Sequence, residues 1–179
     1  MMKFLLFFFL AVVTIHVSAQ QKEYVCLPCG HSCDAQTHSG PGTCQACNMT
    51  LVEKSTIKFG NLTTEEFCKR IAANPKALIL DVRSPEEFNG KTTDVPSFGH
   101  FKNAINVNVT ELEQRLGELS QYKDREILVY CSHSHRSPRA SYILSTHGFK
   151  TVKNLTGGVS TFVGQESSPY LKKSFVFHD

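Results

Sequence analysis

The sequence predicts an α/β fold, namely a three-layer domain with a central parallel sheet flanked by helices, preceded by a small cysteine-rich module. Continuous apolar runs of strand length, such as ALILDV and EILVY, alternate with segments of helical periodicity. Strands that alternate with helices form parallel sheets that are covered on both faces. The module is predicted because five of the seven cysteines lie within residues 26–47.

The N-terminal residues 1–19 have the pattern of a secretory signal peptide. Lys3 supplies a positive charge, residues 4–13 are apolar without a break, and a small-residue cleavage motif ends at Ala19. This apolar run is too short for a membrane span, which needs about 20 residues. We therefore expect an exported protein, periplasmic or secreted, with no stable membrane insertion after cleavage.

The charge balance argues against nucleic acid as a partner. The chain has 19 basic and 16 acidic side chains, so the loss of Lys3 leaves a net charge of about +2. No run of basic residues is present, whereas domains that bind nucleic acid carry strong basic patches.

Composition divides the mature chain into three segments. A cysteine-rich module is expected over residues 20–54, a linker over 55–63, and a globular domain with a C-terminal tail over 64–179. The module is rich in Cys, Gly, Pro and His and poor in large apolar side chains, so it needs a metal or disulfides to fold.

The elements of the domain follow from their start and stop signals. Thr63 and Glu66 form a capping-box pattern, Thr110 and Ser137 are the expected caps of two later helices, and Gly148 is the expected stop of the last one. Helices are thus predicted over 63–74, 84–88, 110–119 and 137–149, and strands over 77–82, 104–109, 126–130 and 151–155.

Cys131 lies at the carboxyl end of the strand predicted over 126–130, shortly before the last predicted helix. In open α/β sheets, ligands bind beyond the carboxyl ends of the strands. Inward-facing N–H groups of the intervening loop and the positive end of the helix favour an anion, and a thiolate over a thiol. Arg136 adds a full positive charge. We therefore expect Cys131 to be a nucleophile whose ionised sulfur is open to solvent.

The spacing between this cysteine and the arginine separates sulfur transfer from phosphate-ester hydrolysis, two chemistries that use such a cradle. Four residues lie between Cys131 and Arg136. The corresponding loop of cysteine phosphatases has five residues between its cysteine and its arginine. The tighter loop leaves room for one extra sulfur atom, so a cysteine phosphatase or arsenate reductase is the less favoured alternative. A further alternative for Cys131 is that it is buried and has only a structural role. For Cys68, that structural role is the expected one.

Residues 64–163 resemble a rhodanese (sulfurtransferase) domain. The stretches LILDVRSPEEF, GHFKNAINV, VYCSHSHRS and GFKTVKNLTGGVSTF are similar to the motifs of that family and follow its order. The resemblance implies a rhodanese-like fold, a persulfide on Cys131, and no cofactor at that site. It also implies that Arg136 helps to position a small anionic donor such as thiosulfate, and that a thiophilic acceptor then takes the sulfur.

The loop after the cysteine supplies the remaining candidates of the site. By the resemblance, its amides cradle the persulfide. Three roles are open for the two histidines, namely hydrogen-bond donors to the substrate, a metal-binding pair or modifiers of the ionisation of the cysteine, and the last is the favoured one. The candidate substrate-binding residues are Ser132, His133, Ser134, His135 and Ser137.

Three positions depart from the family pattern. Ser134 stands where many members have glycine, which indicates a different backbone angle in the loop. Phe162 stands where a tryptophan is common after the double glycine. The stretch 89–98 is longer than the usual connection and is expected to be a solvated loop.

The cysteine-rich module contains two Cys-x-x-Cys knuckles, CLPCG and CQACN, separated by 14 residues, close to the spacing of a four-cysteine zinc site. We therefore expect a zinc-ribbon-like module. The segment also resembles the small heavy-metal-binding module of bacterial metal-handling proteins, through YVC, PGTCQAC and the methionine that follows. By that likeness the metal ligands are Cys26, Cys29, Cys44 and Cys47.

The identity of the metal and of its ligands is open at this point. His31 and Cys33 are further donors in the same segment. Zinc is the expected metal, and Cu(I) is the alternative because soft sulfur donors suit it. Disulfides are a second alternative, since an exported chain meets an oxidising compartment.

The leading hypothesis is an exported sulfurtransferase of the thiosulfate sulfurtransferase type with a metal-binding module. Its expected partners are a small anionic sulfur donor and a thiophilic acceptor. The alternative from another class is a periplasmic metal-binding protein whose larger domain carries a persulfide without turnover.

Overall fold

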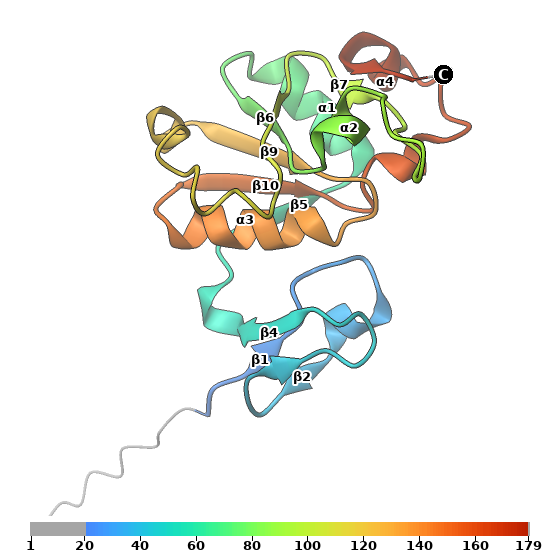
Figure 1. Cartoon of the computed structure of the whole chain (residues 1–179). Coiled ribbons are helices and arrows are strands. Elements are labelled where there is room, and N and C mark those ends of the chain that lie inside the picture. Colours follow the sequence, from blue (N-terminus) through green and yellow to red (C-terminus); the bar gives the residue numbers. More distant parts are fainter. Residues whose placement is uncertain (1–20, 179) are drawn as a thin grey trace, which may run out of the picture.

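The computed structural model describes residues 21–178, and Figure 1 shows a small N-terminal sheet beside a larger α/β domain. The signal peptide predicted over residues 1–19 lies outside the described residues. Among the residues that are described, no helix has the length and apolar character that crossing a membrane requires.

A five-stranded parallel sheet forms the centre of the larger domain, as the sequence predicts. Its strands, in spatial order, are β5 (Gly60–Leu62), β10 (Thr151–Leu155), β9 (Glu126–Tyr130), β6 (Leu78–Asp81) and β8 (Ile105–Asn106). Every neighbouring pair is parallel, so the carboxyl ends of the strands meet at one edge of the sheet. β5 lies within the segment 55–63 that composition assigns to a linker.

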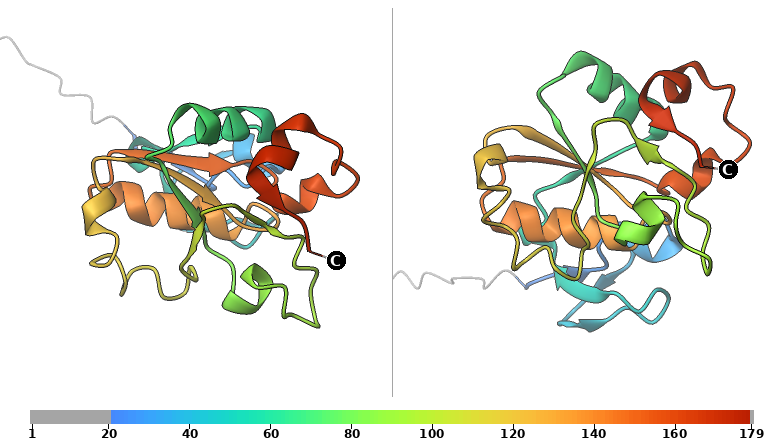
Figure 2. Two further views of the ribbon diagram at one scale, coloured as in Figure 1. Left: turned by 90° about the horizontal axis from the view of Figure 1, so that it is seen from above. Right: turned by 45° about the horizontal axis from the view of Figure 1, so that its top comes forward.

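Helices cover both faces of this sheet. They are α1 (Thr64–Ala73), α2 (Pro85–Phe88), α3 (Arg136–Thr146) and α4 (Pro169–Ser174). Figure 2 shows α3 on one face and α1 on the other. Along β9, Ile127 and Val129 pack in the core that contains α3 residues, whereas Leu128 and Tyr130 pack in the core that contains α1 and α4 residues. This alternation is that of a strand buried on both faces.

The prediction of a helix over residues 110–119 is wrong. This segment forms consecutive turns, and half of its N–H groups bond to carbonyl groups three residues earlier, as in a 3₁₀ helix. Asn108 rather than Thr110 is the capping side chain, because its oxygen accepts from the Thr110 N–H at 3.1 Å. Gly117 lowers the helix propensity of the segment, although its buried leucines still follow the amphipathic spacing.

The helix predicted over 137–149, with Ser137 as its cap, begins two residues earlier than expected. α3 starts at Arg136, with His135 at its N-cap in place of Ser137. It ends at Thr146, and Gly148 follows with φ +86, as the stop signal predicts. The early start moves the positive end of the helix toward the cysteine loop.

The N-terminal module is a small antiparallel sheet. Its strands, in spatial order, are β2 (Thr37–His38), β1 (Tyr24–Val25), β4 (Thr50–Glu53) and β3 (Gly42–Thr43), and its 3₁₀ turns are η1 (Ser32–Ala35) and η2 (Lys54–Thr56). The buried core of the module consists of four cysteines and Leu51. So small an apolar core agrees with the expectation that the module depends on a metal or disulfides.

The larger domain has four smaller elements in addition to the central sheet and the α-helices. They are the two-stranded antiparallel sheet of β7 (His100–Phe101) and β11 (Phe175–Val176), and the 3₁₀ turns η3 (Ser120–Tyr122) and η4 (Val159–Phe162). Of these, η4 bears on the site because it follows the double glycine after β10.

A buried ion pair joins the end of β6 to the long loop after α2. Neither side chain of the pair is exposed, and Nη2 of Arg83 lies 2.6 Å from Oδ2 of Asp81. Arg83 also donates to the carbonyl groups of Ser97 and Gly99, at 2.5 and 2.7 Å. The loop over 89–98 is exposed along most of its length, as expected, and these two bonds fix its C-terminal end.

Removing one partner of this pair is expected to destabilise the domain strongly. Arg83→Met leaves the Asp81 carboxylate buried and unpaired, which costs about 3–5 kcal/mol in the free energy of unfolding. Urea unfolding followed by circular dichroism measures the loss. The matched control is the double variant Asp81→Asn/Arg83→Met, which is expected to lose less than the single variant. An equal or larger loss in the double variant contradicts the assignment of the cost to the unpaired carboxylate.

Candidate active site

Cys131 directly follows β9, where the sequence places it. Its side chain is only 1% exposed, so the expectation of a sulfur open to solvent is wrong for this structure. The small side chains of Ser132, Ser134 and Ser137 are buried as well and let the chain close over the sulfur. The hydroxyl of Ser137 lies 3.2 Å from the Cys131 sulfur, and a hydroxyl at this distance can donate to a thiolate.

The backbone of the loop after Cys131 has N–H groups that are free to bind a ligand. Within residues 21–178, no N–H group of residues 132–135 donates to a backbone carbonyl. The loop leads directly into the N-terminus of α3, where the helix dipole is positive. Unpaired N–H groups at a helix N-terminus form a site for an anion.

The double glycine packs against the other side of the loop. The carbonyl groups of Cys131 and Ser132 accept from the N–H groups of Val159 and Ser160, at 3.0 Å each. Gly158 has φ +70, and a Cβ atom there would lie 2.3 Å from the carbonyl oxygen of Ser132. Glycine is therefore required for this approach, and the motif serves to hold the carbonyl groups of the loop in place.

Ser134 adopts a left-handed backbone conformation, which is the conformation that glycine favours. Its φ is +59, a region that costs a non-glycine residue about 1–2 kcal/mol. Its side chain is 1% exposed, and its hydroxyl has no hydrogen-bond partner among the described residues. The loop thus holds both backbone strain and an unsatisfied polar group.

Arg136 is held by Glu87, a residue that sequence reasoning did not assign to the site. The segment SPEEF folds as α2 because Ser84 and Glu87 form a reciprocal capping box. The same carboxylate accepts two bonds from the Arg136 guanidinium, at 2.5 and 2.8 Å, and Arg136 also donates to the Ser132 hydroxyl at 2.6 Å. Burial raises the pKa of Glu87, but the bonds from Arg136 and Ser84 outweigh it and leave the pKa below its usual value.

This ion pair changes what Arg136 can do. The guanidinium bridges α2 and the start of α3. Its main effect is therefore to fix the shape of the loop, and this effect does not require a bound donor. Its side chain is 34% exposed, and Glu87 neutralises part of its charge. The capping box could have drawn attention to Glu87, but nothing local indicates a partner 49 residues away.

The two histidines of the loop contact different elements. The ring of His133 lies 5.7 Å from that of Phe98, and the ring of His135 lies 5.4 Å from that of His31 in the module, measured between centroids. Neither histidine belongs to the potential metal-binding group found among the described residues. Phe162 packs at 1% exposure against Phe101 in the second core.

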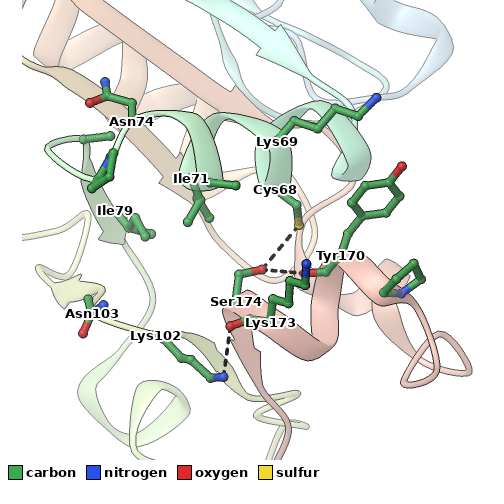
Figure 3. A pocket seen from close by; sticks show the side chains of 14 residues that line it. Cys68, Lys69, Ile71, Asn74, Ile79, Lys102, Asn103, Tyr170, Lys173 and Ser174 are labelled. Atoms are coloured by element: carbon green, nitrogen blue, oxygen red, sulfur yellow. Dashed lines mark hydrogen bonds between the residues drawn. The ribbon is translucent and has the colours of Figure 1, made fainter.

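Cys68 belongs to a different region, the cavity between α1 and α4 shown in Figure 3. The cavity has a volume of about 510 Å³, apolar residues such as Ile71 and Ile79, and three lysines. The Cys68 sulfur lies 3.7 Å from the Ser174 hydroxyl, and burial raises the pKa of the thiol. Because Cys68 is buried in the second core, the structure agrees with the expectation that it packs.

Four thiols of the module converge in one group that can hold a metal ion. The sulfur atoms of Cys26, Cys29, Cys33 and Cys47 all lie within 4.8 Å of one another. The Cys26–Cys47 and Cys29–Cys33 pairs are 3.1 and 3.6 Å apart, longer than a disulfide bond of about 2.05 Å. All seven cysteines of the described residues are free thiols. Four thiols at this spacing fit a tetrahedral metal ion.

Cys33 stands in this group where the sequence predicts Cys44. The turn η1 brings Cys33 back toward the first knuckle. Cys44 is buried in the same core, and hydrogen bonds from the N–H groups of Ala46 and Cys47 lower its pKa to about 7. Burial raises the pKa of the thiols of Cys33, Cys26 and Cys29. Five cysteines are thus available for four positions around a metal.

Comparison with known proteins gives a family for most of the larger domain. The model of the rhodanese-like domain family matches residues 63–165. The uncharacterized protein YqhL of Bacillus subtilis is 36% identical over 104 residues, which cover 58% of this chain and 72% of that protein.

Two further similarities cover smaller parts of their counterparts. The tRNA uridine(34) hydroxylase of Hamiltonella defensa is 30% identical over 115 residues, 59% of this chain, and this chain spans only 30% of that protein. The crystal structure of reduced Bacillus anthracis CoADR-RHD matches with a TM-score of 0.51 and 24% identity, over 66% of this chain and 18% of that one. The latter similarity concerns the fold alone.

Replacing Ser134 by glycine is expected to stabilise the protein by about 1 kcal/mol. The change removes the left-handed strain and the unsatisfied buried hydroxyl, and this gain exceeds the entropy that glycine adds to the unfolded chain. Thermal unfolding should show a midpoint about 2–4 °C higher. The control Ser134→Ala removes the hydroxyl but keeps the strain, so it should be less stable than Ser134→Gly. An alanine variant as stable as the glycine variant contradicts the strain argument.

Proposed function

Because the chain belongs to the rhodanese-like domain family, we propose that it is a sulfurtransferase of the thiosulfate sulfurtransferase type. It moves a sulfane sulfur from an anionic donor through a persulfide on Cys131 to a thiophilic acceptor. The observation that carries the proposal is the loop after Cys131, whose N–H groups are unpaired within the described residues and lead into the N-terminus of α3.

The proposed reaction has two displacements at sulfur. The Cys131 thiolate attacks the outer sulfur of thiosulfate, the S–S bond of the donor breaks, and sulfite leaves with the bonding electron pair. The new persulfide carries its negative charge on the terminal sulfur, where the loop N–H groups and the helix dipole stabilise it. A thiolate or cyanide then attacks that terminal sulfur, and the Cys131 thiolate is regenerated.

The burial of Cys131 favours sulfur transfer over phosphate-ester hydrolysis. At 1% exposure, the thiol is reached more readily by a single sulfur atom at the tip of a donor than by a phosphorus atom surrounded by four oxygens. The loop of four residues between Cys131 and Arg136 supports the same choice. Arg136 and Glu87 act here as positioning residues that hold the loop around the sulfur.

For the N-terminal module we propose a structural zinc site. The ligands are Cys26, Cys29, Cys33 and Cys47, the four thiols that lie within 4.8 Å of one another, and a bound zinc ion supplies folding energy to a module whose apolar core is small. Cu(I) is the second candidate, because the ligand set consists of sulfur alone. The cysteine group also supports a second function, a metal-binding protein whose larger domain carries a persulfide without turnover.

We also propose that the protein is exported, on the basis of the signal-peptide pattern in residues 1–19. The names of the tRNA uridine(34) hydroxylases describe those longer proteins, of which this chain spans less than a third in the example given above. We do not propose that activity for this chain, since its weak net charge offers no support for binding RNA.

Incubation with thiosulfate is expected to add one sulfur atom to Cys131. Intact-mass spectrometry of the folded protein, before and after treatment with cyanide, measures the gain and its loss as thiocyanate. Cys131→Ala should show no gain, whereas the matched control Cys68→Ala should gain the sulfur as the native chain does. A native chain that binds no sulfur while its circular dichroism is unchanged removes the enzymatic proposal. A persulfide that forms but never passes to cyanide favours the carrier function.

The purified protein is expected to hold one metal ion in its module, with Cys33 as a ligand. Cys33→Ser should lose the metal, and its module should become sensitive to protease, because a site of three thiols binds zinc weakly. Cys44→Ser, the matched control, should keep the metal. Inductively coupled plasma mass spectrometry counts and identifies the ion. The reverse pattern, with metal lost only in Cys44→Ser, contradicts the ligand set taken from the structure and restores the set predicted from sequence.

A further inference from the structure

The N-terminal module lies against the loop that holds Cys131. The rings of His31 and His135 are 5.4 Å apart between centroids. A Cβ atom at Gly30 would lie 4.0 Å from Cγ2 of Thr156, the residue before the double glycine. Further along the interface, the hydroxyl groups of Thr56 and Tyr142 are 2.9 Å apart. Figure 1 shows the module on the α3 side of the domain.

This interface contains a cavity of about 620 Å³, which we call the vestibule. Seven residues line it, from both parts of the chain: Cys29, Gly30, His31, His133, His135, Thr156 and Gly157. Three of them carry imidazole rings, and none carries a carboxylate. An imidazole ring can donate a hydrogen bond through an N–H group, so the lining suits a ligand with hydrogen-bond acceptors, such as an anion.

The backbone around the vestibule adds to this preference. His135 is the N-cap of α3, a helix of 11 residues, and no side chain caps its first N–H groups. The neighbouring Ser134 hydroxyl is buried and has no partner among the described residues. The N-terminus of α3 is therefore a favourable position for an anion beside this wall of the vestibule.

Two acidic side chains, Asp34 and Glu87, are bonded to residues in or next to the walls of the vestibule. Asp34 accepts from the backbone N–H groups of Cys29 and Gly30, at 3.0 and 2.8 Å, and thereby shapes the turn that presents His31. Glu87 is bonded to Arg136. Both carboxylates therefore help to fix the walls of the vestibule. Because they accept hydrogen bonds from these partners, they are not aimed at a ligand in the vestibule.

We propose that the vestibule binds a sulfur oxyanion, thiosulfate as the donor and sulfite as the product, and that His31 of the module is a binding residue for it. The inference rests on the proposed function, and it adds that the substrate site is shared between the two parts of the chain. Loop residues 133 and 135 form one wall, and the turn that ends at His31 forms the other. Donor affinity then depends on the fold of the cysteine module.

Binding is tested first without turnover, in the full mature chain carrying Cys131→Ser. Isothermal titration with thiosulfate gives its Kd, and His31→Ala in this background is expected to raise the Kd about fivefold or more, as the loss of a hydrogen bond to a charged group does. His31→Gln, which keeps an N–H donor, should recover part of the affinity. The matched control is His147→Ala, an exposed histidine at the far end of α3, which should leave the Kd unchanged.

Turnover in the native background separates binding from a structural effect. His31→Ala is expected to raise KM for thiosulfate by a similar factor, while kcat and KM for cyanide stay as in the native chain. Equal increases in both KM values, or an unchanged Kd for thiosulfate, overturn the vestibule proposal even if Cys131 forms a persulfide. Conversely, a Kd that depends on His31 in a chain that forms no persulfide upholds the anion site and removes the sulfurtransferase proposal.

Discussion

The shape of the candidate site depends on the ion pair between Glu87 and Arg136. Glu87 is 5% exposed, so its carboxylate is costly to bury without a partner, and Arg136 supplies two hydrogen bonds to it. The same carboxylate completes the capping box of α2. One side chain thus ties the helix after β6 to the helix after β9, and the loop that begins at Cys131 is stretched between these fixed points. The ion pair between Glu87 and Arg136 therefore fixes the position of the C-terminal end of the loop.

The opposite side of the loop is fixed by backbone alone. Val159 and Ser160 hold the carbonyl groups of Cys131 and Ser132, and only a glycine at position 158 permits the approach. With both its carbonyl groups and its arginine bound, the loop has little freedom to relax the positive φ of the residue in its middle. The strain is therefore a consequence of clamping a short loop from two sides.

The parts of this architecture that sequence could predict are the local ones. Capping signals and apolar runs involve residues a few positions apart, so the central strands, α1, α2 and the position of Cys131 follow from them. The role of Glu87, the burial of the Cys131 sulfur and the place of Cys33 among the module's thiols were missed, because each depends on chain segments that meet only in the folded state. Residues 110–119 carry helical periodicity, but periodicity reports which side chains face the core and leaves the backbone bonding pattern undecided. The contact between His31 and the loop joins two parts that composition treats as separate.

The near-complete burial of the Cys131 sulfur also bears on its chemical survival. Oxidation of a cysteine follows its thiolate character and its accessibility, so the Cys131 sulfur, at 1% exposure, is expected to react with peroxide more slowly than an exposed thiol does. Over-oxidation to a sulfinic acid, which is irreversible for most proteins, is slowed at such a position. A thiol arranged in this way can remain active among oxidants that would inactivate an exposed one.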